Sequence, residues 1–338
     1  MSEPVDDPEG VLELRVEQLR READGVLSVT LADPEGGLLP AWEPGAHIDL
    51  ELPWDDGGTG GAEARLVRQY SLCGDPADRF TYTVAVLREH DSSGGSAFVH
   101  DELRPGDLVE VGGPRNHFAL VPAERYLFVA GGIGITPILP MIRAAEAAGT
   151  AWTLAYGGRR RETMAFLGDL AAHGDRVRVV VEAESGPLDL DAVLSGPREG
   201  TAVYCCGPAG LLDAVEARCD PARADDAWPE GALHIERFQA KAFDVDPARE
   251  RPFQVVCARS EVTVQVPAGR SITDCLDGAG IAVPTACREG ICGSCETKIL
   301  DGVAEHRDSL LTRAEQEAGQ TLMVCVSRAR SERLVLDL

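Results

Sequence analysis

Three cysteines stand close together near the C-terminus of this 338-residue chain. Cys287, Cys292 and Cys295 have the spacing C-x4-C-x2-C, and a fourth, Cys325, lies on a later apolar run where residues 322–326 are expected to form a strand. A 2Fe–2S cluster takes four thiolate ligands, and a tight loop can wrap three of them around the two irons. The spacing therefore predicts a 2Fe–2S cluster held by these four cysteines.

A structural zinc site is the alternative use of these thiols. Zinc sites usually pair two short arms of the form C-x2–4-C or H-x3–5-H, whereas here three cysteines lie on one arm and one stands alone. Gly290, Gly293 and Ser294 also suit a cluster loop, because small residues let backbone N–H groups approach the sulfurs and tune the reduction potential. The pattern favours the cluster.

Composition narrows the class of protein. The length predicts two or three domains, and 44% hydrophobic residues are enough for their cores. A net charge of −24 argues against nucleic acid or an anionic membrane as a partner, although it would attract a basic protein. No apolar run is long enough to span a bilayer, and residues 1–8 are acidic, unlike a signal peptide, so we expect a cytoplasmic protein.

The first domain, residues 1–121, is expected to be an antiparallel β-barrel. Short segments that alternate apolar and polar residues are separated by turn clusters, which is typical of such barrels. The expected strands are residues 11–19, 25–32, 45–52 and 80–87. We expect His47 to be structural and the glycine-rich residues 57–61 to form a surface loop.

Two stretches of this barrel carry chemistry. The first is Arg68-Gln69-Tyr70-Ser71, and the second is a loop of small residues that runs into a helical pattern at residues 92–103. Gly94, Gly95 and Ser96 could cradle a phosphate, because free N–H groups at a helix start attract anions, with Arg68 as the opposing cation. An ordinary helix start is the alternative interpretation.

The second domain, residues 122–238, is expected to be an α/β nucleotide-binding domain with a parallel sheet. A buried strand at residues 125–130 leads into Gly131-Gly132-Ile133-Gly134-Ile135-Thr136-Pro137 and then a helix at 138–148, an order that places a pyrophosphate at the helix start. The loop lacks the full G-x-G-x-x-G pattern. The further expected elements are strands at 151–156, 176–182, 201–206 and 232–238 and a helix at 209–218.

A polar linker at residues 239–251, which contains Pro247, is expected to lead to the third domain. Residues 252–338 should form an α+β, β-grasp-like ferredoxin domain around the cysteine loop. Beyond residues 322–326, its expected elements are two strands after Pro252, a helix at 271–279 and strands at 296–300 and 333–336.

These motifs, in this order, resemble the phthalate dioxygenase reductase family, within the wider ferredoxin–NADP reductase-like group. The resemblance covers nearly the whole chain. It rests on residues 68–73, Gly94-Gly95-Ser96, residues 131–137, Tyr204-Cys205-Cys206-Gly207-Pro208, the cysteine set and Glu305-His306-Arg307-Asp308.

The resemblance implies FMN as the flavin. Arg68 would pair with its phosphate, Tyr70 would pack on the isoalloxazine ring and Ser71 would hydrogen-bond to N5. The residues expected to bind the flavin are Arg68, Gln69, Tyr70, Ser71, Gly94, Gly95, Ser96 and Phe238.

The resemblance also implies a site for the pyridine nucleotide. Gly132, Gly134 and Thr136 would hold the pyrophosphate, and Cys206 would lie beside the nicotinamide. Glu236 and Phe238 would end the last strand of this domain and also face the flavin. The residues expected to be catalytic are Ser71, Cys206 and Glu236.

The implied reaction carries a hydride from NADH to FMN and then single electrons through the cluster to a terminal oxygenase, of the Rieske or O-demethylase type. Arg159-Arg160-Arg161 could hold a 2′-phosphate, so NADPH stays open as the donor. We expect a monomer. The alternatives are a reductase for a haem-thiolate monooxygenase, a redox sensor without an oxygenase, and an interaction module without cofactors.

Overall fold

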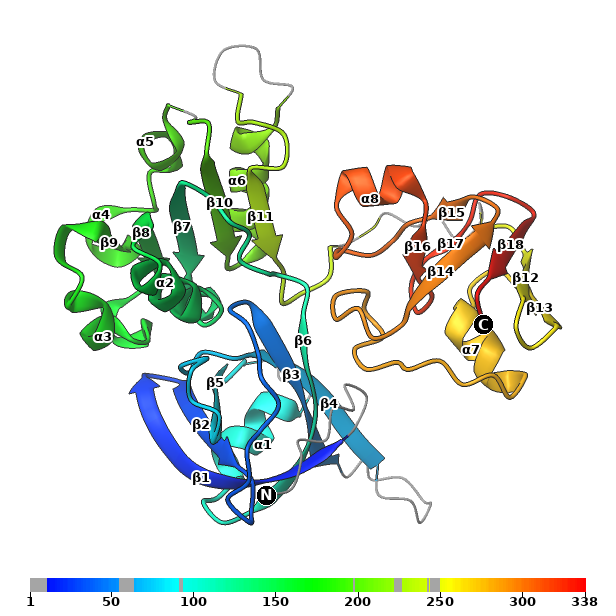
Figure 1. The fold of residues 1–338 in the computed structure, drawn as a ribbon, viewed down its shortest axis with the longest axis horizontal. Helices are drawn as coiled ribbons and strands as arrows, with labels where there is room; N and C mark the ends of the chain where they lie inside the picture. The colour runs from blue at the N-terminus through cyan, green and yellow to red at the C-terminus, as the bar shows by residue number, and fades with distance from the viewer. Residues whose placement is uncertain are drawn as a thin grey trace. The chain divides into compact units, whose positions relative to one another are not determined.

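The computed structural model describes residues 11–54, 64–90, 94–196, 198–221, 227–241, 243 and 250–338. The chain divides into two compact units, Met1–Glu236 and Arg237–Leu338 (Figure 1). The glycine-rich loop at 57–61, the loop residues 92 and 93 and most of the predicted linker, including Pro247, lie outside the described residues. Among the described residues, no helix is both long and apolar enough to cross a membrane.

The first part of the first unit is a six-stranded antiparallel sheet in the order β4-β3-β6-β1-β2-β5, which confirms the predicted class. A bridge between Leu72 and Val84 brings the end that carries β4 to β5, so the sheet curls toward a barrel. Its strands are β1 (Leu12–Ala23), β2 (Val26–Ala32), β3 (Ala46–Trp54), β4 (Ala64–Ser71), β5 (Thr81–Leu87) and β6 (Leu108–Asn116), with helix α1 at Gly95–Asp101. The sequence did not predict β4 or β6 as strands.

The second part of this unit is a parallel five-stranded sheet in the order β11-β10-β7-β8-β9. Alternate residues of its strands face opposite layers: Phe128 packs with residues of α2, whereas Val129 packs with residues of α5 and α6. The strands are β7 (Arg125–Gly131), β8 (Ala151–Gly158), β9 (Val177–Val181), β10 (Thr201–Cys206) and β11 (Leu233–Glu236). The helices are α2 (Ile138–Ala147), α3 (Leu167–Ala171), α4 (Glu182–Ser185), α5 (Leu190–Leu194) and α6 (Ala209–Cys219), with short 3-10 turns η1 (Gly132–Ile135), η2 (Arg161–Thr163) and η3 (Gly174–Arg176).

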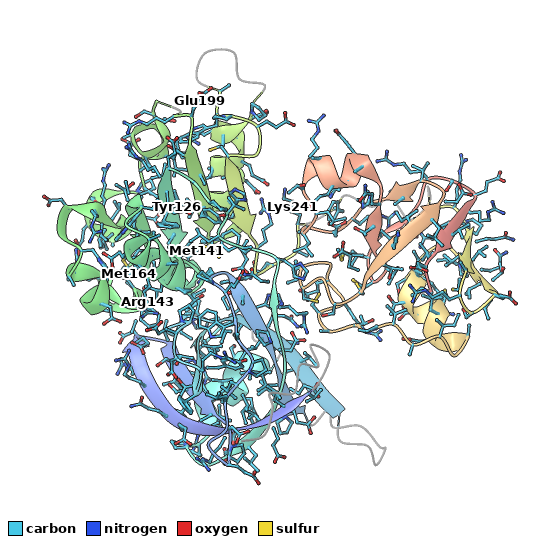
Figure 2. The ribbon with its side chains drawn as sticks, viewed as in Figure 1. Tyr126, Met141, Arg143, Met164, Glu199 and Lys241 are labelled. Atoms are coloured by element: carbon cyan, nitrogen blue, oxygen red, sulfur yellow. The ribbon has the colours of Figure 1, made fainter. Side chains whose placement is uncertain are left out.

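Side chains of the parallel sheet hold the segment that joins it to the barrel. The Tyr204 hydroxyl donates to the Ala119 carbonyl at 2.8 Å and accepts from the Val121 N–H at 2.7 Å. Tyr126 donates to the Val121 carbonyl at 2.9 Å. Arg143 of α2, labelled with Tyr126 in Figure 2, donates to the Cys73 carbonyl of the barrel at 2.9 Å. These bonds explain why barrel and sheet form one unit.

The second unit is a mixed sheet in the order β13-β12-β18-β14-β16, with a separate pair β15-β17. Its elements are β12 (Phe253–Cys257), β13 (Val262–Val266), α7 (Ile272–Gly278), β14 (Glu296–Asp301), β15 (Ala304–Glu305), α8 (Arg313–Ala318), β16 (Thr321–Met323), β17 (Arg328–Ala329) and β18 (Arg333–Leu336). Ser271 caps α7, and Thr312 with Glu315 forms a capping box on α8.

One predicted element of this unit is wrong. Cys325 does not lie on a strand, because β16 ends at Met323. The Met323 carbonyl accepts the N–H groups of Val326 and Ser327, at 3.3 and 2.9 Å, and these bonds close a turn around Cys325. A fully buried apolar run does not by itself reveal where the strand gives way to a turn.

The loops that follow β7 and β10 pack backbone against backbone. A Cβ atom on Gly134 would lie 2.3 Å from the Cys206 carbonyl oxygen and 2.6 Å from the Gly207 nitrogen. Because backbone atoms cannot move aside as a flexible side chain can, only glycine fits at this position.

We expect Gly134→Ala to lower the free energy of unfolding of the first unit by about 1–3 kcal/mol, as overpacking does. Gly210→Ala is the matched control: no atom lies within 4 Å of its added Cβ, and it should be neutral or slightly stabilising. Urea unfolding followed by tryptophan fluorescence measures this unit alone, because all four tryptophans precede Arg237. Equal stability of the two variants would contradict the close contact.

Candidate functional site

Arg68 and the start of α1 lie together, as the sequence predicted. A Cβ atom on Gly95 would lie 2.6 Å from Arg68 Cγ and 3.3 Å from its Nε, so the arginine side chain runs across this glycine. The Ser96 hydroxyl accepts the Glu89 N–H at 3.2 Å, and Gly94 has a φ of 104°. A cation and the start of a helix therefore share one place on the barrel.

Gln69 and Tyr70, which follow Arg68 on β4, have different surroundings. Gln69 donates to Asp49 at 2.8 Å, and Arg115 also donates to this buried carboxylate. Tyr70 is half-buried, and burial raises the pKa of its hydroxyl to about 12, so it is neutral near pH 7. The Asp49–Arg115 pair that orients Gln69 has no recognisable motif in the sequence.

The three residues predicted to be catalytic meet at one carboxyl group. Ser71, at the end of β4, donates to Glu236 Oε2 at 3.2 Å, and Cys206 Sγ lies 3.9 Å from the same oxygen. Glu236 and Cys206 are paired residues on the adjacent parallel strands β11 and β10. The contact therefore connects the barrel to the parallel sheet.

Both acids at this contact are held in their neutral forms. Burial raises the pKa of Glu236 to about 8, against the lowering effect of its hydrogen bonds with Ser71 and Cys206. Burial raises the pKa of the Cys206 thiol well above its usual range, and the charge that Glu236 carries when it ionises raises it further. Shifted pKa values of this kind gather at functional sites.

The residues predicted to hold the pyrophosphate lie at the carboxyl end of β7. Gly132 accepts the Tyr156 hydroxyl at its carbonyl, at 3.1 Å, and Gly134 packs on Cys206 as described above. Thr136 is buried and its hydroxyl donates to the Ile133 carbonyl at 3.0 Å, which stabilises the turn. Phe238 lies in the second unit and is 37% exposed; its contact with the flavin stays a prediction.

The four predicted cluster ligands come together. The Cys287 thiol interacts with those of Cys292 and Cys325, and the Cys295 thiol interacts with that of Cys325. The Glu289 N–H donates to Cys287 Sγ at 3.3 Å, and Ser294 Oγ lies 3.3 Å from Cys292 Sγ. This donor set fits a 2Fe–2S cluster, which needs four thiolates with hydrogen-bond donors near their sulfurs.

The described residues contain no group of three or more histidine, cysteine, aspartate or glutamate side chains placed to hold a metal ion. A two-iron cluster would use the four thiols in a different way, because each iron would take only two of them.

The structure also pairs charges that the sequence left open. Arg161, one of three arginines considered for a 2′-phosphate, donates to Glu184 through Nε at 3.1 Å and Nη2 at 2.8 Å. Two parallel bonds of this kind occupy the guanidinium edge. The partner follows β9, more than twenty residues along the chain, so local spacing did not reveal the pair.

We expect the stability of the first unit to fall as the pH rises from 6 to 9. Glu236 has a folded pKa near 8, above that of an exposed glutamate, so its stabilising contribution is complete below the unfolded pKa and is lost as pH rises through 8. The loss should be roughly 2–3 kcal/mol in urea unfolding followed by tryptophan fluorescence. Glu236→Gln should remove most of it, whereas Glu230→Gln, at an exposed position, should not; an unchanged loss in Glu236→Gln would refute the assignment.

Comparison with known proteins connects these sites to chemistry. The Fer2 family, the 2Fe-2S iron-sulfur cluster binding domain, matches residues 255–330. The phenoxybenzoate dioxygenase subunit beta of Ectopseudomonas oleovorans is 44% identical over 330 residues, which are 96% of this chain and 97% of the relative. The phthalate dioxygenase reductase of Burkholderia cepacia is 38% identical over 344 residues and 100% of both chains.

Two solved structures extend the comparison. A phthalate dioxygenase reductase, described as a modular structure for electron transfer from pyridine nucleotides to [2Fe-2S], has a TM-score of 0.66 and 37% identity over 97% of this chain and 98% of that one. An intact type IV self-sufficient cytochrome P450 monooxygenase has a TM-score of 0.87 and 43% identity over 100% of this chain, which spans 43% of that protein. Identity of this extent over whole chains shows that the protein belongs to the phthalate dioxygenase reductase family, the oxidoreductases that serve as reductase components of oxygenases.

Proposed function

We propose that this protein passes electrons from NADH through FMN and a 2Fe–2S cluster to a terminal oxygenase. Residues 1–121 would bind FMN, residues 122–238 the nucleotide, and residues 252–338 the cluster, with 239–251 as the linker. When bound, a flavin takes two electrons as a hydride and releases them singly, as a 2Fe–2S cluster requires. The observation that carries the proposal is the meeting of Ser71, Cys206 and Glu236 in a chain that also gathers four thiols.

Arg68, Gly94, Gly95 and Ser96 would bind the FMN phosphate. The proposal is supported by the position of the Arg68 side chain, which runs across Gly95 at the start of α1. A monophosphate carries enough negative charge to use both. Tyr70, neutral and half-buried on the same strand, would provide the flat surface for the isoalloxazine ring.

Ser71, Glu236 and Cys206 would position the reacting rings. Glu236 accepts a hydrogen bond from the Ser71 hydroxyl and so fixes the direction of that hydroxyl. Cys206 would act by packing, because a buried thiol with a raised pKa is a poor nucleophile at neutral pH. The neutral forms of Glu236 and Cys206 also leave no charge beside the nicotinamide, whereas Gly132, Gly134 and Thr136 would hold the pyrophosphate.

NADH is the proposed donor. Arg161 already donates two hydrogen bonds to Glu184, so binding a 2′-phosphate with this arginine would break an existing pair. The Glu184 carboxylate would also repel the phosphate. Both effects favour the nucleotide that lacks a 2′-phosphate.

The proposed partner is a Rieske-type oxygenase or O-demethylase, with this chain acting as a monomer. Phthalate dioxygenase reductase and the vanillate O-demethylase oxidoreductase of a Pseudomonas strain, 39% identical over 97% of this chain, support this choice by their names. A net charge of −24 would favour a basic docking face on the acceptor.

A haem-thiolate monooxygenase is the second candidate partner. It is favoured by the TM-score of 0.87 and 43% identity to the self-sufficient cytochrome P450. Stopped-flow reduction of one purified oxygenase from each class, with this protein and NADH, distinguishes the two, because only the matching acceptor should be reduced at a rate that depends on its concentration.

We expect Cys292→Ser to abolish the visible absorption of the cluster and the reduction of one-electron protein acceptors. NADH-driven reduction of a two-electron dye should persist, because that step needs only the flavin. Cys275→Ala is the matched control: it removes a buried thiol of the same unit outside the ligand set and should retain both activities. If dye reduction fell equally in a Cys292→Ser protein that still held flavin, the proposed electron order would be wrong.

Arg68→Ala should weaken FMN binding by about 2–4 kcal/mol, since it removes the cation from a partly buried phosphate pair. Fluorescence titration of the flavin-free protein measures the change. Arg21→Ala, which removes an exposed arginine of the same barrel, should leave binding unchanged. Chromatography of the cofactor released by acid should identify FMN, and recovery of FAD would overturn the assignment.

A further inference from the structure

The segment 305–309 of the second unit touches both halves of the ligand set. Its Arg307 N–H donates to Ser327 Oγ at 3.3 Å, two residues after Cys325. Its Ser309 N–H donates to the Gly290 carbonyl at 3.0 Å, within the loop that carries the other three cysteines. One short segment therefore fixes the position of the cysteine loop relative to the turn that carries Cys325.

Asp308 is the charged residue of this segment that faces the loop. Its side chain has no exposed surface, and its Cα would lie 3.1 Å from a Cβ atom built on Gly290. Oδ2 accepts the N–H groups of Leu310 and Leu311, at 3.3 and 2.8 Å. Oδ1 has no hydrogen-bond partner among the described residues.

His306 is the neighbour of that oxygen. Its side chain is 8% exposed, and neither ring nitrogen has a hydrogen-bond partner in the described part of the chain. Nδ1 lies 3.5 Å from Asp308 Oδ1, slightly longer than a formed hydrogen bond. Because a buried unpaired polar atom is costly, a small movement that closes this gap satisfies Nδ1 and Oδ1 together.

The other charged groups around the segment are already engaged. Arg307 pairs with Glu250 at 2.5 Å and Glu305 at 2.8 Å. Arg288, in the cysteine loop, pairs with Asp274 and Asp277. Among the described residues no arginine or lysine pairs with Asp308, and His306 is the side chain that neighbours its unpaired Oδ1 atom.

We propose that the His306–Asp308 pair positions the cluster loop and sets the reduction potential of the cluster. A carboxylate in a low-dielectric interior beside the loop opposes the negative charge that reduction adds. A hydrogen bond from His306 Nδ1 draws the negative charge of the Asp308 carboxylate toward the imidazole. It therefore weakens the repulsion between this carboxylate and the charge that reduction adds. The inference rests on the proposed ligation of the cluster by Cys287, Cys292, Cys295 and Cys325.

The test is a reductive titration of the full-length holoprotein at pH 8, with the cluster followed by electron paramagnetic resonance. Asp308→Asn removes the charge but keeps an oxygen for the N–H groups of Leu310 and Leu311. This substitution should raise the reduction potential of the cluster. The distribution of one electron between flavin and cluster should shift about tenfold toward the cluster, which corresponds to about 59 mV. Glu305→Gln, the same change at a 39% exposed side chain, should shift it several times less.

Variants of His306 separate positioning from simple packing. Asn presents an amide donor near the place of Nδ1, so His306→Asn should retain the wild-type potential, whereas His306→Leu should lower it. In the Asp308→Asn background His306→Leu should have little effect, because the two residues act as a unit.

Four outcomes would overturn the proposal: equal shifts in Asp308→Asn and Glu305→Gln, equal shifts in the two His306 variants, an unchanged effect of His306→Leu in the double variant, or loss of the cluster from Asp308→Asn. If the wild-type protein showed no cluster signal, the proposed ligation would fail as well. If the wild-type cluster forms but none of these substitutions changes its potential, only the inference about His306 and Asp308 fails, and the proposed ligation stands.

Discussion

The Glu236 carboxyl group is the contact on which the proposed chemistry of the first unit depends. It accepts a hydrogen bond from Ser71 of the barrel and contacts Cys206 of the parallel sheet. The pairing of Cys206 with Glu236 on adjacent strands sets their distance, and a slip of one residue between β10 and β11 would turn Glu236 to the other face. All six residues of β10 are buried. A shifted register would place different side chains in this closely packed core, so the packing fixes the register.

Much of the fold followed from local patterns. The cysteine spacing predicted the ligand set because three of the four ligands lie within nine residues, and alternating apolar residues revealed β2, β3 and β5. β6 was missed because it contains Gly112, Gly113 and Pro114, which favour turns. The strand expected at Cys325 is a turn, since complete burial of residues 322–325 erases the alternation that would have marked its end.

The candidate site was only partly predictable. Its residues were named from the family resemblance, but the contact between Ser71 and Glu236 joins positions 165 residues apart, and no local pattern encodes such a contact. Arg161 illustrates the opposite limit. Three successive arginines are open to a 2′-phosphate in the sequence, yet Arg161 is engaged by Glu184 of α4. Charge in a sequence therefore indicates a binding capacity, while its pairing in the fold determines what remains available.

Buried charges in the second unit have a common structural effect. Arg328 donates to three carbonyls, those of Arg270, Arg251 and Pro267, and its guanidinium lies 5.0 Å from the ring of Phe253. Glu250 accepts Arg307 and the Gly269 N–H. Buried ions contribute little net stability even when fully bonded, but each of these bonds crosses between segments that would otherwise move independently.

The consequence of this bonding concerns the cluster. Arg307 is fixed by Glu250 on one side and by Ser327 on the other, so the residues next to it, His306 and Asp308, inherit a defined position against Gly290. Residues held in this way have little freedom to move, and the polar groups around them are already oriented. The charged network of the second unit thus fixes the positions of the segments around the cysteine loop, while it adds little to stability.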